Sequence, residues 1–333
     1  MDIRRVDAPE AFDLADWNQI LRLDPNRHIF ATPEWSRLWW EAFGQDMETF
    51  VLTFHDPDPV ALAAFTLDET NEGRRLRFLG GDDLTDYLGP VVAGEQHQRR
   101  VAESLLVYLR DKLGDWSYFD AKSLPVPFGF SEWLVEAADR LEMLQHLELY
   151  ELTAVLALPS TFEEYLAGLS RKQRHELSRK MRRFERELPE AVLRTSSSED
   201  LDQDLASFIE LHRGSEGPKG EFMVPARARF FERVANRFQS TGHLFLDSFQ
   251  LDGRMVAATF SFEYEGVFYL YNSAYDPTLK SVSPGLILVA RLIQRSIAKG
   301  CRRFDFLRGR ERYKYDLGAE ALPLHSVLIR RPA

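Results

Sequence analysis

Residues suited to bind a phosphorylated ligand gather between 271 and 300, in YNSAYDPTLKSVSPGLILVARLIQRSIAKG. A strand ending near Tyr275 is followed by a loop and then by a helix predicted to begin at Pro284. Proline suits a first helical turn, glycine admits close approach, and the exposed N–H groups of a helix start suit a pyrophosphate. An ordinary capped helix on a sheet explains the pattern equally well. The candidate phosphate-binding residues are Lys280, Ser281, Val282, Ser283 and Gly285.

A second group of reactive side chains lies in and after the predicted strand RRFDFL, residues 302–307. Glu311 could act as a base in a cleft at the carboxyl end of this strand, or be a solvated loop carboxylate. Asp305 alternates with two phenylalanines, so it faces either that cleft or water. Tyr313 and Lys314 could supply a phenolic proton and a cation for a phosphate or oxyanion, or form the surface of a short helical turn. These four residues are the catalytic candidates.

The segment ELHRGSEGPKGEF, residues 210–222, ends a predicted helix and continues as a charged, glycine-rich loop. A helix end favours a protonated histidine, so dipole compensation explains His212 about as well as substrate binding does. Flexible loops on rigid scaffolds often recognise substrates, so we expect His212, Lys219, Phe222 and Tyr275 to contact a substrate. Cys301 is expected to be a buried structural thiol rather than a nucleophile.

A basic helix is predicted at 170–187 in a chain whose net charge is −10. Residues 171–187 contain eight basic and three acidic side chains, a local excess of about +5. The acidic whole predicts no general attraction to nucleic acid or membranes. The helix is therefore either a solvated face or a local, salt-sensitive contact of residues 171–186 with a phosphate-rich ligand, such as transfer RNA, a lipid-linked sugar or anionic headgroups.

Two stretches repeat one order of elements that would position these side chains. Strands at 48–56, 59–69 and 74–81 precede a helix at 98–113 and a strand at 116–124. Strands at 243–250, 255–263 and 266–275, the first two joined by an Asp-Gly turn, precede a helix at 284–299 and a strand at 302–307. A strand at 144–159, the basic helix and helices at 199–213 and 225–239 lie between the two. Chance arrangement in an α/β protein is the alternative.

Length, composition and missing motifs exclude several classes. A chain of 333 residues exceeds one ordinary core, and 44% hydrophobic and 28% charged residues are typical of a globular protein. One cysteine, and histidines never closer than 27 residues, argue against disulfides and metal sites. Dinucleotide, P-loop, zinc-hydrolase and serine-hydrolase motifs are missing. Without a signal peptide or transmembrane segment, we expect a cytoplasmic bacterial protein that could act at the inner membrane surface.

The order strand, loop, helix and strand resembles the coenzyme A-binding core of the GNAT acyltransferase superfamily. The loop there usually reads Q/R-x-x-G-x-G/A, whereas this sequence has KSVSPG with a single glycine. Together with LSRKQRHELSRKMRRFER, ELHRGSEGPKGEF and FDFLRGRERYKYDLGA, this departure resembles the BioF2-like acetyltransferase branch associated with cellulose biosynthesis. That branch is akin to the two-module FemABX aminoacyltransferases. The resemblance runs from about Phe30 to Gly318, but Arg310 precedes Glu311 where related sequences carry an acidic residue directly after the glycine.

The resemblance implies an α/β (α+β) fold of two tandem GNAT-like modules, residues 1–150 and 151–333, each a mixed, mainly antiparallel sheet with flanking helices. It also implies N-acyl transfer from acetyl-CoA or another acyl-CoA, held in the second module, to an amine of an amino sugar or other cell-envelope or exopolysaccharide precursor. One alternative is a FemABX-like transferase with an aminoacyl-tRNA donor. Another is a degenerate, non-catalytic scaffold of a polysaccharide machine.

The matching loop of the first module, residues 80–97, reads GGDDLTDYLGPVVAGEQH. Its four acidic residues, Asp82, Asp83, Asp86 and Glu95, would repel a pyrophosphate. We therefore expect this module not to bind coenzyme A. LGGDDLTDYLGPVV also resembles the first-module loop of the BioF2-like branch, which makes Asp86 and Tyr87 candidates for contact with the acceptor.

Overall fold

The structure is a computed structural model that describes residues 1–332, with the side chain of Pro218 left out. The chain divides into unit 1, residues 1–152 and 322–333, and unit 2, residues 153–321. The division after Leu152 lies two residues from the sequence-based boundary. The last twelve residues differ from the expectation because they belong to unit 1, where Leu324–Arg330 pair antiparallel with Tyr118–Pro125. Val327 and Ile329 enter the core there.

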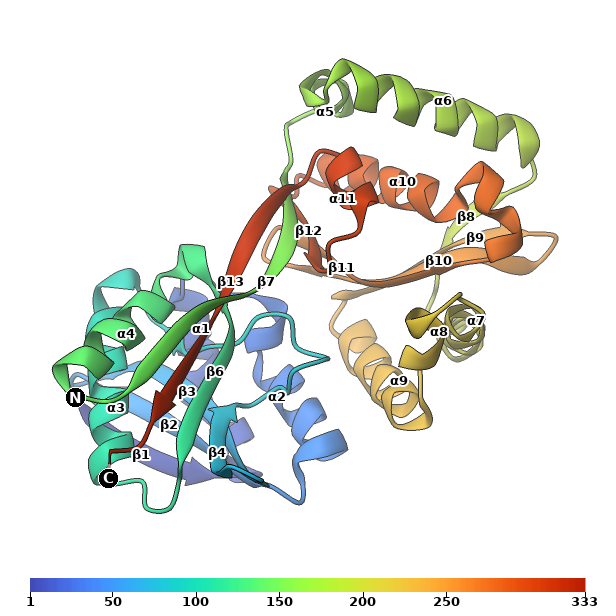
Figure 1. The fold of residues 1–333 in the computed structure, drawn as a ribbon. Coiled ribbons are helices and arrows are strands. Elements are labelled where there is room, and N and C mark those ends of the chain that lie inside the picture. Colours follow the sequence, from blue (N-terminus) through green and yellow to red (C-terminus); the bar gives the residue numbers. More distant parts are fainter. Residues whose placement is uncertain (333) are drawn as a thin grey trace. The chain divides into compact units, whose positions relative to one another are not determined.

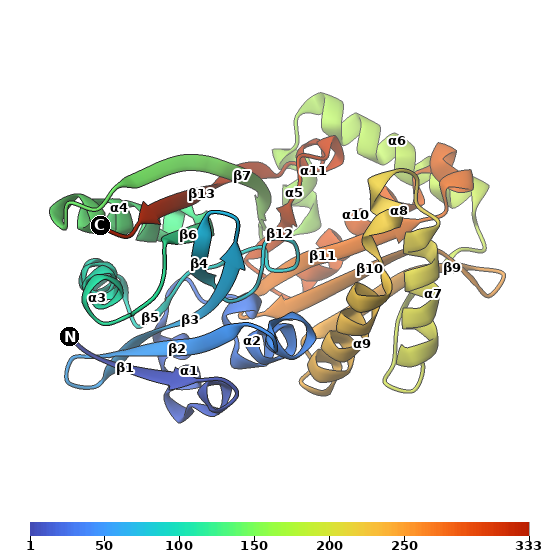
Figure 2. The same ribbon diagram turned by 60° about the horizontal axis from the view of Figure 1, so that its bottom comes forward.

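Unit 1 is a mixed sheet whose order is β1-β2-β3-β4-β6-β13, and β7 follows β13. β4 and β6 pair in parallel, and α3 is the crossover helix between them. α3 and α4 pack their apolar faces on one side of the sheet, and α1 contacts β3 on the other (Figures 1 and 2). The elements are β1 (Asp2–Asp7), α1 (Ala15–Leu23), α2 (Pro33–Trp39), β2 (Glu48–His55), β3 (Pro59–Thr70), β4 (Gly73–Phe78), β5 (Val91–Val92), α3 (Gln98–Asp111), β6 (Tyr118–Pro125), α4 (Phe130–Arg140), β7 (Gln145–Ala157) and β13 (Glu320–Arg330).

Unit 2 is built on the sheet order β12-β11-β10-β9-β8, with residues 153–157 of β7 beside β12. β8 to β11 are antiparallel neighbours, whereas β11 and β12 run parallel and are joined through α10. The elements are α5 (Phe162–Gly168), α6 (Arg171–Glu187), β8 (Val192–Thr195), α7 (Leu201–Arg213), α8 (Pro218–Phe222), α9 (Pro225–Ser240), β9 (Leu244–Leu251), β10 (Arg254–Tyr264), β11 (Val267–Tyr275), the 3₁₀ turn η6 (Pro277–Val282), α10 (Pro284–Ala298), β12 (Arg303–Arg308) and α11 (Arg312–Asp316).

Helices cover both faces of the unit 2 sheet. α10 lies on one face with α6 outside it, and α7, α8 and α9 lie on the other (Figure 1). α10 packs there because its apolar stripe, including Ile287, Leu288 and Ile293, is buried against β10 and β11. α6 begins at a capping box, in which Ser170 accepts the N–H of Gln173 and the Gln173 side chain accepts the N–H of Ser170.

The predicted repeat of three antiparallel strands, a crossover helix and a further strand is confirmed in both units, and the structure adds that the last strand pairs in parallel with the third. The basic helix, predicted at 170–187, spans Arg171–Glu187, with Ser170 as its N-cap. Prediction was wrong in the loop before Met223, which contains the short helix α8 behind a proline at its first position. It also left out β1, β8 and β13. Edge and terminal strands carry little periodic signal of their own, because distant residues pair with them.

Candidate functional site

The parallel strands β11 and β12 separate soon after they begin. Their described pairing covers Val267–Tyr269 against Arg303–Asp305 and no later residues. A register shift opposite Phe260 and Ser261 gives β11 a bulge. β12 bends as well, because Leu307 has a φ of +58° and its N–H is accepted by Asp305 Oδ1 at 2.9 Å. Bulges re-aim strands in this way, so the carboxyl ends of β11 and β12 diverge and leave room between them.

The start of α10 faces this region with unpaired backbone donors. Ser283, the N-cap, is in the left-handed conformation with a φ of +55°, and its side chain caps no N–H. Ile287 N–H bonds Ser283 O, and Pro284 has no N–H. Among the described residues, no group accepts the N–H of Gly285 or Leu286. Two donors at the positive end of a fifteen-residue helix are therefore available to an anion.

A cavity of about 220 Å³ opens at this helix start. Six predicted site residues line it together: Lys219, Tyr275, Lys280, Ser283, Gly285 and Tyr313. The Tyr275 ring lies against Gly285, where a Cβ atom would come within 3.2 Å of Tyr275 Cδ1. Glycine therefore leaves the helix start open beside the aromatic ring, as the sequence-based expectation required. Sequence reasoning missed three lining residues, Ser273, Leu286 and Val289. Ser273 was detectable, because it shares a strand face with Tyr275 at a spacing of two.

Two predicted phosphate-binding residues lie outside this cavity lining. The Val282 side chain is 5% exposed and packs in the interior, so only its backbone could contribute to an anion site. Ser281 is exposed on η6. The 3₁₀ turn explains the difference, because it points successive side chains in different directions about its axis.

Tyr313 meets β11 at the cavity. Its side chain and that of Ser273 on β11 line the same cavity, and its ring contacts Phe306 edge to face at 6.3 Å. Burial raises the pKa of Tyr313 well above that of a free phenol, and the nearby Glu311 carboxylate raises it further. The phenol therefore keeps its proton at neutral pH and can donate it.

The predicted cation Lys314 is buried, with a 3% exposed side chain. Its Nζ donates to Arg308 O at 2.6 Å and, more weakly, to Leu307 O and Gly309 O at 3.4 Å. Glu311 Oε2 lies 3.0 Å away. These partners tie Lys314 to the loop between β12 and α11, and the cavity lining does not include it. Its position follows from the loop carbonyls, which need a donor once they are buried.

The two carboxylate candidates differ in exposure. Asp305 is fully buried and accepts the N–H of Leu307, which holds the bend there. The expectation that its side chain faces either a cleft or water was therefore wrong. Glu311 is 57% exposed and paired with Lys314, and it acts electrostatically on both Tyr313 and Lys219. Of the two, only Glu311 is accessible for exchanging protons with a ligand.

His212 corrects the expectation of a protonated helix end. The residue is 1% exposed, the Phe208 and Phe222 rings lie at 6.0 and 5.7 Å, and its Nδ1 is buried without a hydrogen-bond partner among the described residues. Desolvation, helped by the charge of Lys219, lowers the pKa of His212 to about 4. Burial therefore outweighs the helix dipole, and the imidazole is neutral at physiological pH.

Phe222 packs between His212 and Arg227, whose guanidinium lies 4.5 Å from the ring centre. Lys219 lines the cavity as part of the same short helix, α8. Desolvation lowers the pKa of its amine, with Glu311 opposing and Lys314 reinforcing that shift.

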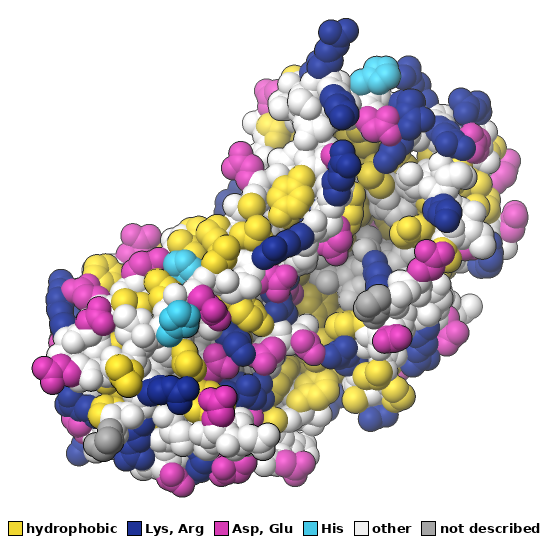
Figure 3. Space-filling view, viewed as in Figure 1, with side chains coloured by type: hydrophobic (Ala, Val, Ile, Leu, Met, Phe, Trp, Pro, Cys, Tyr) yellow, Lys and Arg dark blue, Asp and Glu magenta, His cyan; other side chains and the backbone are white. Residues whose placement is uncertain are grey.

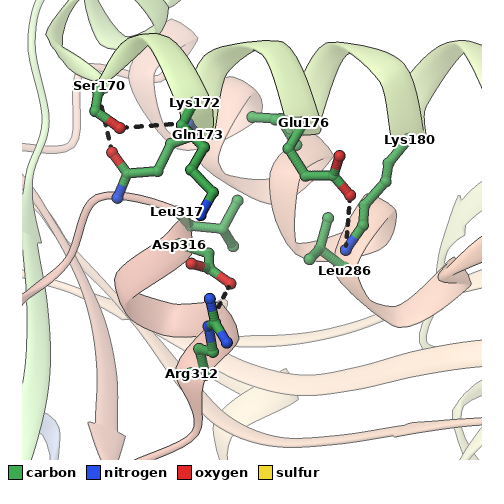
Figure 4. Close-up of a pocket in the computed structure, with 10 residues that line it drawn as sticks. Ser170, Lys172, Gln173, Glu176, Lys180, Leu286, Arg312, Asp316 and Leu317 are labelled. Atoms are coloured by element: carbon green, nitrogen blue, oxygen red, sulfur yellow. Dashed lines mark hydrogen bonds and ion pairs between the residues drawn. The ribbon is translucent and has the colours of Figure 1, made fainter.

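A second cavity of about 470 Å³ lies between α6, α10 and α11. Lys172, Lys180 and Arg312 supply cations to it, and Leu286 lines both this cavity and the first (Figure 4). Lys180 lies 3.9 Å from Glu176 and Arg312 lies 3.6 Å from Asp316, whereas no described residue pairs with Lys172. Lysine and arginine side chains gather on the surface over α6 (Figure 3). Part of the basic helix thus borders a cavity at the start of α10.

The remaining two candidates belong to unit 1. Asp86 is 7% exposed and Tyr87 is 2% exposed, and the Tyr87 ring contacts His28, Phe30 and Phe128. A nearby cavity, lined in part by His28 and Phe128, holds only about 30 Å³, the space of one water molecule. Cys301 is a free, buried thiol, as predicted.

No helix in the described part of the chain combines the length and apolarity needed to cross a membrane.

Comparisons with known proteins agree with this geometry. Residues 171–315 match the family model of the Acetyltransferase (GNAT) domain. Over 98% of this chain and 97% of the other, the fold is similar to a crystal structure of FemX, with a TM-score of 0.69 and 11% identity. The C-terminal domain of a putative lysylphosphatidylglycerol synthetase from Agrobacterium fabrum has a TM-score of 0.60 at 10% identity, covering 97% and 92%. L-PGS from Bacillus licheniformis has a TM-score of 0.55 at 14% identity, covering 97% and 91%. No curated protein matches the sequence. Identities this low show a shared fold.

Proposed function

Because residues 171–315 are a GNAT acyltransferase domain, which in general implies an acyl-CoA donor, we propose that the chain moves an acyl group from acetyl-CoA or a related acyl-CoA to an amine. The observation that carries this proposal is the cavity at the start of α10, beside the end of β11. It combines free helix N–H groups, lysine side chains and a protonated phenol.

The donor's pyrophosphate would bind the N–H groups of Gly285 and Leu286, with Lys280 adding charge. A cavity of about 220 Å³ is smaller than the ~300–1,000 Å³ of clefts that enclose a whole drug-sized ligand, so it suits only the reactive end of the donor. The larger basic cavity beyond Leu286 would take the phosphorylated nucleotide end, beside Lys172 and Lys180. In this arrangement the basic face of α6 binds the nucleotide end of the donor, whereas a merely solvated helix would bind no ligand.

Acyl transfer requires a neutral amine, a fixed direction of attack and a proton for the departing thiolate. Tyr313 lines the cavity and keeps its proton at neutral pH, so it would give that proton. Glu311 is the accessible carboxylate near the cavity residues and would receive a proton from the acceptor, directly or through water. Lys314 positions Glu311 and the loop beneath it.

For the acceptor we propose an amine of a cell-envelope precursor, such as an amino sugar destined for a polysaccharide. The likeness in fold to FemX and to lysylphosphatidylglycerol synthetases supports a place in envelope chemistry. Lys219 and Phe222 lie at the cavity or beside it and would border the acceptor.

An aminoacyl-tRNA donor is the second candidate, and the cations around the 470 Å³ cavity favour it. A tRNA contact through α6 would weaken steeply with salt, because each neutralised phosphate releases counterions.

Calorimetric titration with acetyl-CoA tests the donor site. Gly285→Leu should weaken binding by about 100-fold, ~2.7 kcal/mol, because the new side chain meets Tyr275 and fills the cavity. Gly114→Leu is the matched control, since a Cβ there meets open space. Salt-sensitive tRNA binding without acetyl-CoA binding would select the second candidate. If neither ligand binds the folded wild-type chain, the chain is not a transferase of either kind and a scaffold role takes its place.

A further inference from the structure

Lys219 is an exposed side chain that borders the donor cavity, and its amine is unengaged. It lines the cavity from α8, opposite the helix start at Gly285 and Leu286, and Tyr313 borders the same space. Within the described residues, no hydrogen bond or ion pair restrains its Nζ. The neighbouring lysine on α11 is different, because Lys314 is fully occupied by three carbonyls and a carboxylate.

The electrostatic surroundings of Lys219 favour a reactive amine. Desolvation lowers its pKa most, the Glu311 carboxylate opposes this, and the Lys314 ammonium lowers the pKa again. His212, the other titratable side chain that interacts with it, is neutral near pH 7 and adds no charge. A larger fraction of Lys219 than of an ordinary surface lysine is therefore neutral and nucleophilic.

Building on the proposed acyl-CoA site, we propose that Lys219 is itself acylated by the donor bound in this cavity, which makes it a self-modification site of the enzyme. The Nζ lone pair attacks the thioester carbonyl carbon, a C–N bond forms and the C–S bond breaks. The thiolate leaves with the bonding electrons and receives the proton lost from nitrogen. An acyl-CoA and a lysine become an N-acyl lysine and free coenzyme A, with no further reactant.

The product is an amide, which does not pass the acyl group on as a thioester does. Acylation removes the positive charge of Lys219 and adds an acyl group to a space of about 220 Å³. The modified enzyme should therefore accept its amine substrate more slowly. Self-acylation would limit turnover when donor is abundant and acceptor is scarce.

Incubation of the full chain with acetyl-CoA, followed by peptide mapping in a mass spectrometer, tests the proposal. Lys219 should gain one acetyl group at least about 100-fold faster than the exposed Lys112, because the donor is held beside it. The rate should saturate with acetyl-CoA. Lys219→Arg should remove the modification, and Lys299→Arg, at a lysine outside the cavity lining, should leave it in place. Thermal unfolding of each variant checks that it folds.

Calorimetry on the same samples separates this proposal from the donor assignment. Acetyl-CoA binding with Lys219 acetylated no faster than Lys112 overturns self-acylation and leaves the donor site intact. Without any acetyl-CoA binding, both proposals fall. Acetyl phosphate, a reactive donor without the coenzyme, is the third arm. If it acetylates Lys219 as selectively as acetyl-CoA does, the lysine is merely reactive and the proposal is wrong.

Discussion

Acidification should destabilise unit 2 through His212. The unfolded chain binds a proton to this imidazole with a pKa near 6.5, whereas the folded chain does so only near 4. Between these values the unfolded state carries more protons, so stability falls as pH falls, and above 6.5 the contribution vanishes. From about pH 7.5 to pH 5 the loss works out to ~2 kcal/mol, out of ~3.4 kcal/mol for the whole shift.

His212→Phe should remove this pH dependence while keeping a ring between Phe208 and Phe222. The quantity to compare is the change in unfolding free energy between pH 7.5 and 5, wild type against variant, so that other titrating groups cancel. All six tryptophans lie within residues 1–152, so tryptophan fluorescence reports unit 1. Hydrogen exchange of β10 and β11 peptides in urea reports unit 2.

A control variant and a refuting outcome complete this test. His146→Gln, at a side chain 70% exposed, should leave the pH dependence of unfolding unchanged. Equal pH dependence in wild type and His212→Phe would refute the argument, because it would mean that His212 binds its proton equally well in the folded and unfolded chain.

Three further outcomes follow from the contacts. Lys314→Met should cost about 3 kcal/mol in urea unfolding of unit 2 by leaving buried loop carbonyls without a donor; a loss below about 0.5 kcal/mol would show that the loop re-pairs. Arg295→Met should cost about 3–5 kcal/mol in the same assay, because it strips two bonds of 2.5 and 2.7 Å from a fully buried carboxylate on β9. Replacing Arg295 and its partner Asp247 together should cost less than Arg295→Met alone, because no buried charge is then left without a partner. The double change Lys172→Ala and Lys180→Ala should weaken acetyl-CoA binding about tenfold at low salt and less at high salt. Arg182→Ala, exposed on the same helix and outside the cavity lining, should have no effect, and an equal loss there would assign the effect to general charge.

Local signals were enough to predict that residues around the start of α10 come together. The helix start at Pro284 and the loop before it are neighbours in the chain, so Lys280, Ser283 and Gly285 reach one cavity without any long-range information. The run of basic residues predicted α6, and the proline at its start with its apolar periodicity predicted α10, for the same reason. Both are properties of residues within one or two turns of each other.

Charge states and the second cavity could not be predicted in this way. A histidine at a helix end favours its protonated form, yet His212 is neutral because it is buried beside Phe208 and Phe222, from two different helices, and next to the charge of Lys219. Lys314 was predicted to bind a ligand, but in the structure its amine donates to a carbonyl of the neighbouring loop.

The sequence alone determined the repeated order of strands and helices, and the donor loop, because periodicity, turns and caps depend on neighbouring residues. Tertiary structure decided which side chains are buried away from water, that Lys219 rather than Lys314 keeps a free amine, and where α6 contacts α10. It also gave the final strand to unit 1. These outcomes depend on desolvation and on pairing between residues far apart in the chain, and both arise only when the elements pack.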